Sequence, residues 1–109
     1  MKRIIRPAAR DDILRQFRYY LVDQDKPEVA ERFLVAAQRT IEEIGRTPYG
    51  GAPKRLSNEA LRGLRSWPVQ EFEDMRIYYL AHEGLVRVVR VLHGKRDINS
   101  ILEKESDET

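Results

Sequence analysis

The chain of 109 residues has no cysteine, only two histidines and no long apolar run. Without cysteine, disulfide bonds and metal sites built on thiolates are excluded. No segment approaches the roughly 18 apolar residues of a membrane-spanning helix, and the first residues lack the apolar core of a signal peptide. A glycine-rich phosphate loop, a metal-spaced cluster of histidines and carboxylates, and a nucleophile–base pair are also missing. We therefore expect a cytoplasmic protein with no membrane contact and no metal.

The composition indicates one folded domain over residues 1–109. Hydrophobic residues make up 41% and charged residues 35% of the chain, as in ordinary globular proteins, and the length suffices for a single core. The formal net charge is +2, but the acidic tail, residues 103–109, holds four acids and one lysine. The remainder has 19 Lys+Arg against 14 Asp+Glu. Such a mildly basic body suits an acidic partner, either nucleic acid or an acidic protein segment.

The first half of the chain predicts a strand followed by two helices. Residues 2–6 are β-like and end at Pro7, which is tolerated in the first turn of a helix. Apolar residues then recur at the spacing of one helix face, at Ile13, Leu14, Phe17, Tyr20 and Leu21. Pro27 opens a second helix whose apolar stripe is Ala30, Phe33, Leu34, Ala37, Ile41 and Ile44. The short connection predicts an antiparallel helix hairpin.

The second half predicts three strands. A Gly- and Pro-rich loop over residues 45–59 separates them from the helices. Residues 61–69 form a strand in which Pro68 marks an edge, a bulge or the end, and residues 75–81 alternate with period two. Residues 85–92 are apolar on nearly both faces, as in a central strand. Asp97 then caps a short C-terminal helix.

The predicted order is therefore β-α-α-β-β-β with a short C-terminal helix. A helix hairpin packed on one face of a small, mainly antiparallel sheet buries each apolar stripe with the fewest elements. The fold class is α+β.

His93 is the first candidate for chemistry. It ends a strand and precedes Lys95 and Arg96, so it could serve RNA cleavage, which requires a base, an acid and cations around one phosphate. The alternative is a corner residue whose ring nitrogens bond nearby backbone. The second reading is favoured, because no second acid–base group has an obvious place opposite His93.

Seven cations gather in the strand half and suit either phosphate recognition or ordinary ion pairing. They are Arg62, Arg65, Arg76, Arg87, Arg90, Lys95 and Arg96. Arg90 lies inside an apolar strand, so it is either paired internally or directed into a functional groove. Trp67 could stack on a base, although aromatic residues at strand spacing are more often packing residues.

Two runs of sequence carry a resemblance to a known family. They read LRSWPV and VLHGKRD, and PAARDDI, PEVAERF and TPYGG precede them in the expected order. Together they resemble the ParE branch of the RelE/ParE superfamily of toxin–antitoxin toxins over nearly the whole chain. The resemblance implies two helices against a small antiparallel sheet, and no cofactor. It also implies a ParD-like antitoxin, which wraps the toxin with its C-terminal segment and binds operator DNA with its N-terminal part.

Two activities follow from this resemblance. ParE-like toxins poison DNA gyrase, whereas RelE-like relatives cleave mRNA on the ribosome as endonucleases. A RelE-like site would loosely match Arg65, Arg76, His93 and Arg96. However, this chain lacks the lysine-rich segment after the second helix and the tyrosine after the last strand that accompany cleavage. We therefore expect a gyrase poison and, with less support, an mRNA endonuclease.

The expected contacts fall in two places. Target-binding residues are expected to be Trp67, Arg90, His93, Lys95 and Arg96. An exposed apolar strip over the hairpin and the sheet edge is expected to bind the antitoxin, near Phe17, Tyr20, Leu21 and Phe33. Operator DNA is expected to be reached only through the antitoxin.

Overall fold

The computed structural model describes residues 2–106 and has the predicted α+β order with two small additions. The elements are β1 (Lys2–Ile5), α1 (Pro7–Arg18), the π-helical turn η1 (Tyr19–Asp23), α2 (Pro27–Arg46), β2 (Ala52–Pro53), the 3-10 turn η2 (Glu59–Leu61), β3 (Arg65–Val69), β4 (Phe72–His82), β5 (Leu85–His93) and α3 (Ile98–Glu103). The additions are β2 and η2, which lie within or just after the predicted loop. No helix in the described part of the chain is long and apolar enough to cross a membrane.

The five strands form one sheet in the order β1-β5-β4-β3-β2. β1 pairs parallel to β5, and every other pair is antiparallel. The prediction of a mainly antiparallel sheet with β5 in a central place is therefore confirmed. The predicted irregularity at Pro68 is also confirmed, since the register of β3 against β4 shifts between Pro68 and Val69.

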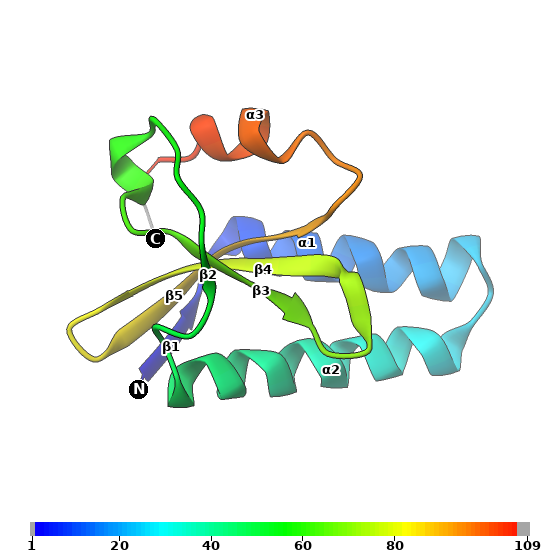
Figure 1. Ribbon diagram of the computed structural model, residues 1–109. Helices are drawn as coiled ribbons and strands as arrows, with labels where there is room; N and C mark the ends of the chain where they lie inside the picture. The colour runs from blue at the N-terminus through cyan, green and yellow to red at the C-terminus, as the bar shows by residue number, and fades with distance from the viewer. Residues whose placement is uncertain (1, 107–109) are drawn as a thin grey trace.

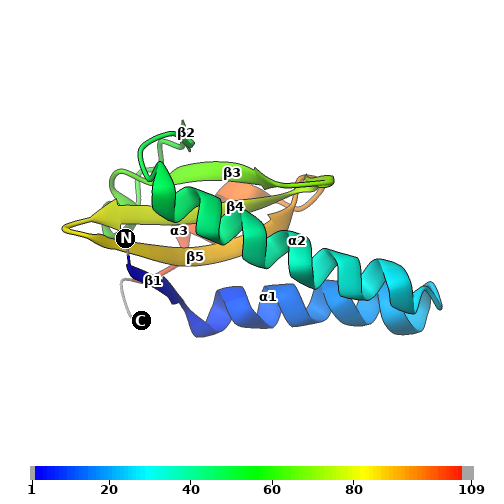
Figure 2. The same cartoon turned by 90° about the horizontal axis from the view of Figure 1, so that it is seen from below.

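The helix hairpin begins where the two prolines predict. Pro7 and Pro27 occupy the first turns of α1 and α2. Backbone N–H groups in a first turn have no acceptor within the helix, so a proline there costs no hydrogen bond. The buried side of α2 is a continuous stripe of Ala30, Phe33, Ala36, Ala37, Thr40, Ile41, Ile44 and Gly45. Figure 2 shows α2 lying across one face of the sheet with α1 beside it. The stripe thus faces the sheet where α2 crosses it, and the N-terminal part of α2 extends past the sheet beside α1.

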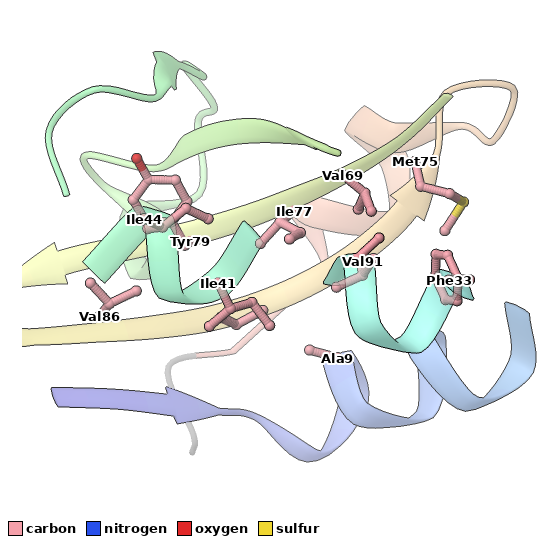
Figure 3. Close-up of a cluster of buried hydrophobic side chains, with 12 residues drawn as sticks. Ala9, Phe33, Ile41, Ile44, Val69, Met75, Ile77, Tyr79, Val86 and Val91 are labelled. Carbon is pink, nitrogen blue, oxygen red and sulfur yellow. The ribbon is translucent and has the colours of Figure 1, made fainter. Parts of the chain in front are cut away.

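The sheet is covered on both faces (Figure 1). Under the hairpin lies a first cluster that includes Ala9, Phe33, Ile44, Ile77 and Val91, several of which are labelled in Figure 3. On the other face, a second cluster is packed beneath α3 and the segment before β3, and consists of Leu61, Leu64, Tyr78, Val89, Leu92 and Leu102. The nearly continuous apolar sequence of β5 follows from this double coverage.

A bulge in β5 changes which residues face the hairpin. Tyr79 pairs with Val88 and Tyr78 pairs with Arg90, so Val89 is an extra residue. As a result Val88 and Val91, three positions apart, both lie in the first cluster. Bulges redirect side chains in this way at sheet edges and near functional sites. Beyond this point β1 no longer pairs with β5, and α1 takes its place.

Candidate partner-binding site

His93, Lys95 and Arg96 lie together at the turn between β5 and α3, which we call the basic corner. The Nδ1 atom of His93 accepts a hydrogen bond from the backbone N–H of Lys95 at 3.1 Å, and the His93 carbonyl accepts from the Arg96 N–H at 3.0 Å. The adjoining Gly94 N–H donates to the Asp74 carbonyl at 2.7 Å. His93 thus makes the backbone contact expected of a corner residue. Lys95 and Arg96 are exposed.

A groove of about 480 Å³ runs from the basic corner along the C-terminal half of α1 and η1. Its floor includes Met75 and Val91, and its rim carries arginines. The lining residues are Asp12, Arg15, Gln16, Arg18, Tyr19, Val22, Asp23, Met75, Val91, His93 and Arg96. Val22 is 68% and Tyr19 42% exposed. We call this the corner groove. An apolar floor with a basic rim suits an amphipathic acidic segment.

The α1 side of the corner groove was missed by the sequence analysis. Arg18 and Tyr19 lie three and four residues after Arg15, and Val22 lies four and three residues after them, which places the four residues on one side of α1 and η1. This mixed stripe lies beside the purely apolar stripe of the same helix. An apolar stripe predicts a buried face, whereas a stripe that mixes basic and apolar residues gives no such signal in the sequence.

Arg90 is held inside the protein, which corrects the expectation that it binds a target. Its Nε and Nη2 donate to the two carboxylate oxygens of Asp12 at 2.7 and 2.8 Å, and its Nη1 donates to Glu105 at 2.8 Å. The two carboxylates raise the pKa of the Arg90 guanidinium, with the Asp12 hydrogen bond as the largest cause. Asp12 also accepts from the Val91 N–H at 2.9 Å. Of the two readings of Arg90, internal pairing is the observed one.

The four residues of the nuclease alternative do not form one site. His93 pairs with Met75 and shares its face, whereas Arg76 pairs with Leu92 on the opposite face. Arg76 donates to the Ser66 hydroxyl at 2.9 and 3.2 Å. Only His93 and Arg96 come together.

The fourth residue of that set lies at the far side of the sheet. Arg65 donates to the carbonyls of Tyr49 and Gly51 at 2.9 and 2.8 Å, and so braces the loop before β2. Trp67, expected to bind the target, is also on β3 and half-buried against the first cluster. β4 lies between β3, which carries Trp67, and β5, at whose end the basic corner lies.

The expected antitoxin strip is partly buried. Phe33 is fully buried in the first cluster (Figure 3), so its place in an exposed strip was wrong: it points from α2 into the sheet. Tyr20 is half-buried between Phe33 and Phe72, with ring centroids 5.7 Å from each. Phe17 is half-buried and Leu21 is 37% exposed. The prediction for these three residues stays a prediction.

A second groove, of about 500 Å³, lies between α1 and α2 on the outer side of the hairpin. It is mainly apolar and includes Ile13, Leu14, Leu34 and Ala37, with Arg3 and Arg10 on its border. Leu14 is 38% exposed. We call this the hairpin groove. Helix α1 is therefore flanked by two grooves, each with apolar lining and basic side chains nearby.

The C-terminal segment is fixed to the body over its described part. The Glu103 carboxylate accepts from the backbone N–H and the hydroxyl of Ser57 at 3.0 and 2.8 Å. Asn58 donates to the carbonyls of Leu102 and Glu105 at 2.8 and 2.7 Å. The first residues of the predicted acidic tail are thus part of the fold. Residues 107–109 lie outside the described residues.

Comparison with known proteins places this fold in a family. The chain is similar in fold to a chain of a solved structure described as the chromosomal ParDE TA system from P. aeruginosa, with a TM-score of 0.69 and 14% identity over 85% of this chain and 95% of that chain. No curated protein matches the sequence. A family model described as the ParE toxin of the type II toxin-antitoxin system parDE matches residues 3–98. This match covers the hairpin, the whole sheet and the basic corner. The chain belongs to the ParE toxin family of type II toxin–antitoxin systems.

Proposed function

We propose that this protein inhibits DNA gyrase in the cytoplasm, blocks replication, and is neutralised by a ParD-like antitoxin. The observation that carries the proposal is the family match over residues 3–98. Gyrase inhibition is the activity implied by the resemblance to ParE toxins. The protein would act by binding its target, and it would contact operator DNA only through the antitoxin.

The arrangement of the cations favours binding over RNA cleavage. Cleavage requires an acid, a base and phosphate-binding cations around one scissile bond. One ring nitrogen of His93 is used by the Lys95 N–H, Arg76 lies on the opposite face, and Arg65 braces a loop. These positions provide no second acid–base group beside His93. The mRNA endonuclease therefore remains the second candidate.

The proposed target surface is the basic corner. Lys95 and Arg96 are exposed, and neither makes a side-chain ion pair within the described residues. Their charges are therefore available to an acidic patch on a partner, and such charges mainly govern association rate and specificity. His93 supports this surface by fixing the turn. Trp67 would require a separate contact, because it lies on β3 and is separated from β5 by β4.

The proposed antitoxin surface is α1 with its two grooves. Exposed apolar side chains lie along α1 and the adjoining η1, namely Leu14, Tyr19, Leu21 and Val22. A segment wrapped around α1 would bury them and place acidic side chains near Arg10, Arg15 and Arg18. We expect a co-expressed complex to bury about 2,000 Å² or more, as permanent hetero-complexes do.

Induction in growing cells tests the proposed activity. A gyrase poison should arrest growth and trigger DNA-damage signalling before mRNA levels fall. A ribosome-dependent nuclease should cleave mRNA early without DNA damage. Normal growth, with neither response, would contradict both functions and indicate a purely regulatory binding domain.

A pair of matched valine variants tests the antitoxin surface. Val22→Glu places a charge on the rim of the corner groove, whereas Val35→Glu places the same charge on α2, outside both grooves; the two valines are 68% and 46% exposed. Val22→Glu should weaken antitoxin binding at least about ten-fold, or about 1.4 kcal/mol. Val35→Glu should change it little. Equal affinities for the two variants, measured by calorimetry, would remove the corner groove from the antitoxin surface.

A further inference from the structure

The cations of the strand half differ sharply in what they contact. Arg65, Arg76 and Arg90 are bonded to groups of the protein itself, as described above, and Lys95 and Arg96 form the basic corner. The two that remain are Arg62 and Arg87. They come from segments far apart in sequence, yet both line one pocket of about 300 Å³.

Arg87 lies on β5, and no hydrogen bond or ion pair joins its side chain to any of residues 2–106. It pairs with Ile4 of β1 and Leu80 of β4 in the strand register. Its Nε is buried, and no acceptor among residues 2–106 lies within hydrogen-bonding distance of it. No ion pair is formed by its guanidinium with a described residue either. A buried donor without an acceptor costs roughly 1–3 kcal/mol, and more when the group is charged. An acceptor supplied from outside would remove that cost.

Arg62 is poised on the rim of the same pocket. Within residues 2–106 it forms one ion pair, with Glu59 at 3.7 Å, and both side chains are more than four-fifths exposed. Such a contact contributes little and leaves the guanidinium able to turn. The neighbouring Gly63 has φ +85° and no atom within 4 Å of the position of a Cβ, so the backbone here leaves open space. Glu83, the acidic residue of the pocket lining, is directed to His82 at 3.3 Å.

We propose that Arg62 and Arg87 form a binding site for a phosphate group. Arginine presents a planar fork of donors that matches the oxygens of phosphate, and two such forks from different segments converge on one anion. Leu80 and Leu85 form an apolar wall beside them, which limits water around the charges. For the phosphate to accept from the buried Nε of Arg87, the Arg87 side chain would turn toward the pocket on binding.

The phosphate site is separate from the basic corner. Arg87 is six residues before His93 on β5, or about 20 Å at 3.3 Å per residue. Arg87 also pairs with Leu80, which packs on the second cluster, so the site opens on the α3 face rather than the hairpin face. The inference therefore goes beyond the proposed toxin activity and does not depend on it.

Arginine Nε–Hε signals in a nitrogen-15 NMR spectrum of the full chain test this site directly. The Arg87 signal is identified by its loss in Arg87→Gln. Inorganic phosphate should shift it in a saturable way, whereas sodium chloride at matched ionic strength should not. A parallel titration uses a short DNA duplex. If the Arg87 signal shifts at a lower concentration of phosphate groups with DNA than with inorganic phosphate, the site binds a nucleic-acid backbone. If it shifts with inorganic phosphate alone, the site binds a small phosphate ligand.

Arg62→Gln and Arg55→Gln provide the comparison within the chain. Arg62 is exposed, so its loss should leave the fold intact and raise the phosphate Kd about ten-fold, as expected for one charge-assisted hydrogen bond. Arg55 is also exposed and does not line the pocket. Arg55→Gln removes the same charge, so the phosphate Kd of this variant should equal that of the wild-type chain. Equal Kd values for the Arg62 and Arg55 variants would overturn the proposal. So would an Arg87 signal that phosphate does not move.

Discussion

At the scale of single residues, Asp12 has the largest structural role that the sequence did not reveal. It is 4% exposed, binds Arg90 through both carboxylate oxygens and accepts the Val91 N–H at the end of the β1–β5 pairing. Asp12 therefore supplies β5 with the hydrogen-bond acceptor that a neighbouring strand would otherwise provide at Val91. It also joins α1 to the sheet, and through Arg90 to Glu105 near the C-terminus.

Asp12→Ala should be strongly destabilising. The change leaves a largely buried guanidinium with one partner and a strand N–H without an acceptor, so we expect a loss of about 3 kcal/mol in the free energy of unfolding. Arg15→Ala removes an exposed side chain 3.9 Å from the same carboxylate and should cost less than about 0.5 kcal/mol. Urea denaturation of both variants measures the difference. Equal losses would mean that the Asp12–Arg90 pair contributes no more than a surface contact.

His93→Ala separates a structural role from a catalytic one. Loss of the bond from the Lys95 N–H should lower stability by about 1 kcal/mol and reduce toxicity only in proportion. A general acid or base would instead cost roughly 10²–10⁴ in activity while stability stayed unchanged. Thermal denaturation and growth inhibition, measured on the same variant, distinguish the two. A large loss of toxicity in a fully stable protein would restore the nuclease reading.

At the scale of elements, local signals predicted most of the fold. Pro7, Pro27 and Asp97 mark helix starts whose chemistry is contained in a few neighbouring residues, and each is found where expected. Strand order was not predictable, because the parallel pairing of β1 with β5 joins segments more than 80 residues apart. The bulge at Val89 likewise depends on the register of two strands.

The candidate site was less predictable than the fold, and for a physical reason. The basic corner is contiguous in sequence, so His93, Lys95 and Arg96 were found together. The wall formed by α1 depends on where the helix lies against β5, which no local pattern encodes. Phe33 was misplaced on the surface because an amphipathic stripe indicates burial of a face without showing which aromatic residues lie at its edge.

The docking of α3 should depend on acidic pH. The two hydrogen bonds from Ser57 stabilise the charged form and hold the pKa of the Glu103 carboxyl below its ordinary value of 4.5. A lowered pKa contributes stability that is present above the unfolded-state pKa and lost as pH falls through the folded-state pKa. Hydrogen exchange at Ile101 and Leu102 should therefore be steady from neutral pH down to about 4.5, after correction for intrinsic rates, and accelerate below it.

Glu103→Gln is the control for that dependence. Its amide cannot titrate, so the acid-induced loosening of α3 should be reduced. An unchanged pH profile in this variant would show that another group holds α3 in place, and would contradict the role given to the Ser57–Glu103 contact.

At the scale of the whole molecule, the protein presents different surfaces on different sides. The grooves flanking α1 lie on the hairpin side, the basic corner lies at one end of β5, and the α3 face carries Arg62 and Arg87. Partner and target need not compete for the same atoms, except where the corner groove meets the basic corner at His93 and Arg96. In the proposed function, an antitoxin segment in the corner groove would cover Arg96 and so block part of the basic corner.

Charge reversal of the basic corner should separate toxicity from folding. Lys95→Glu with Arg96→Glu alters two exposed side chains, so the variant should fold. Because Arg96 also lines the corner groove, antitoxin binding should weaken, but the complex should still form through the remaining contacts of the two grooves. Its toxicity should fall strongly, and more so at higher salt, because exposed charges are screened. Lys54→Glu with Arg55→Glu makes the same charge change at a half-buried lysine and an exposed arginine before β3, and this variant should remain toxic. Equal toxicity of the two double variants would leave the basic corner only a structural role.

Supercoiling of relaxed plasmid by purified DNA gyrase is the most direct test of the central claim. The wild-type protein should inhibit supercoiling at stoichiometric concentrations, and the antitoxin should reverse the inhibition. The Lys95→Glu, Arg96→Glu variant should inhibit much less, whereas the Lys54→Glu, Arg55→Glu control should act like wild type. Undiminished supercoiling at a large excess of folded wild-type protein would contradict the account.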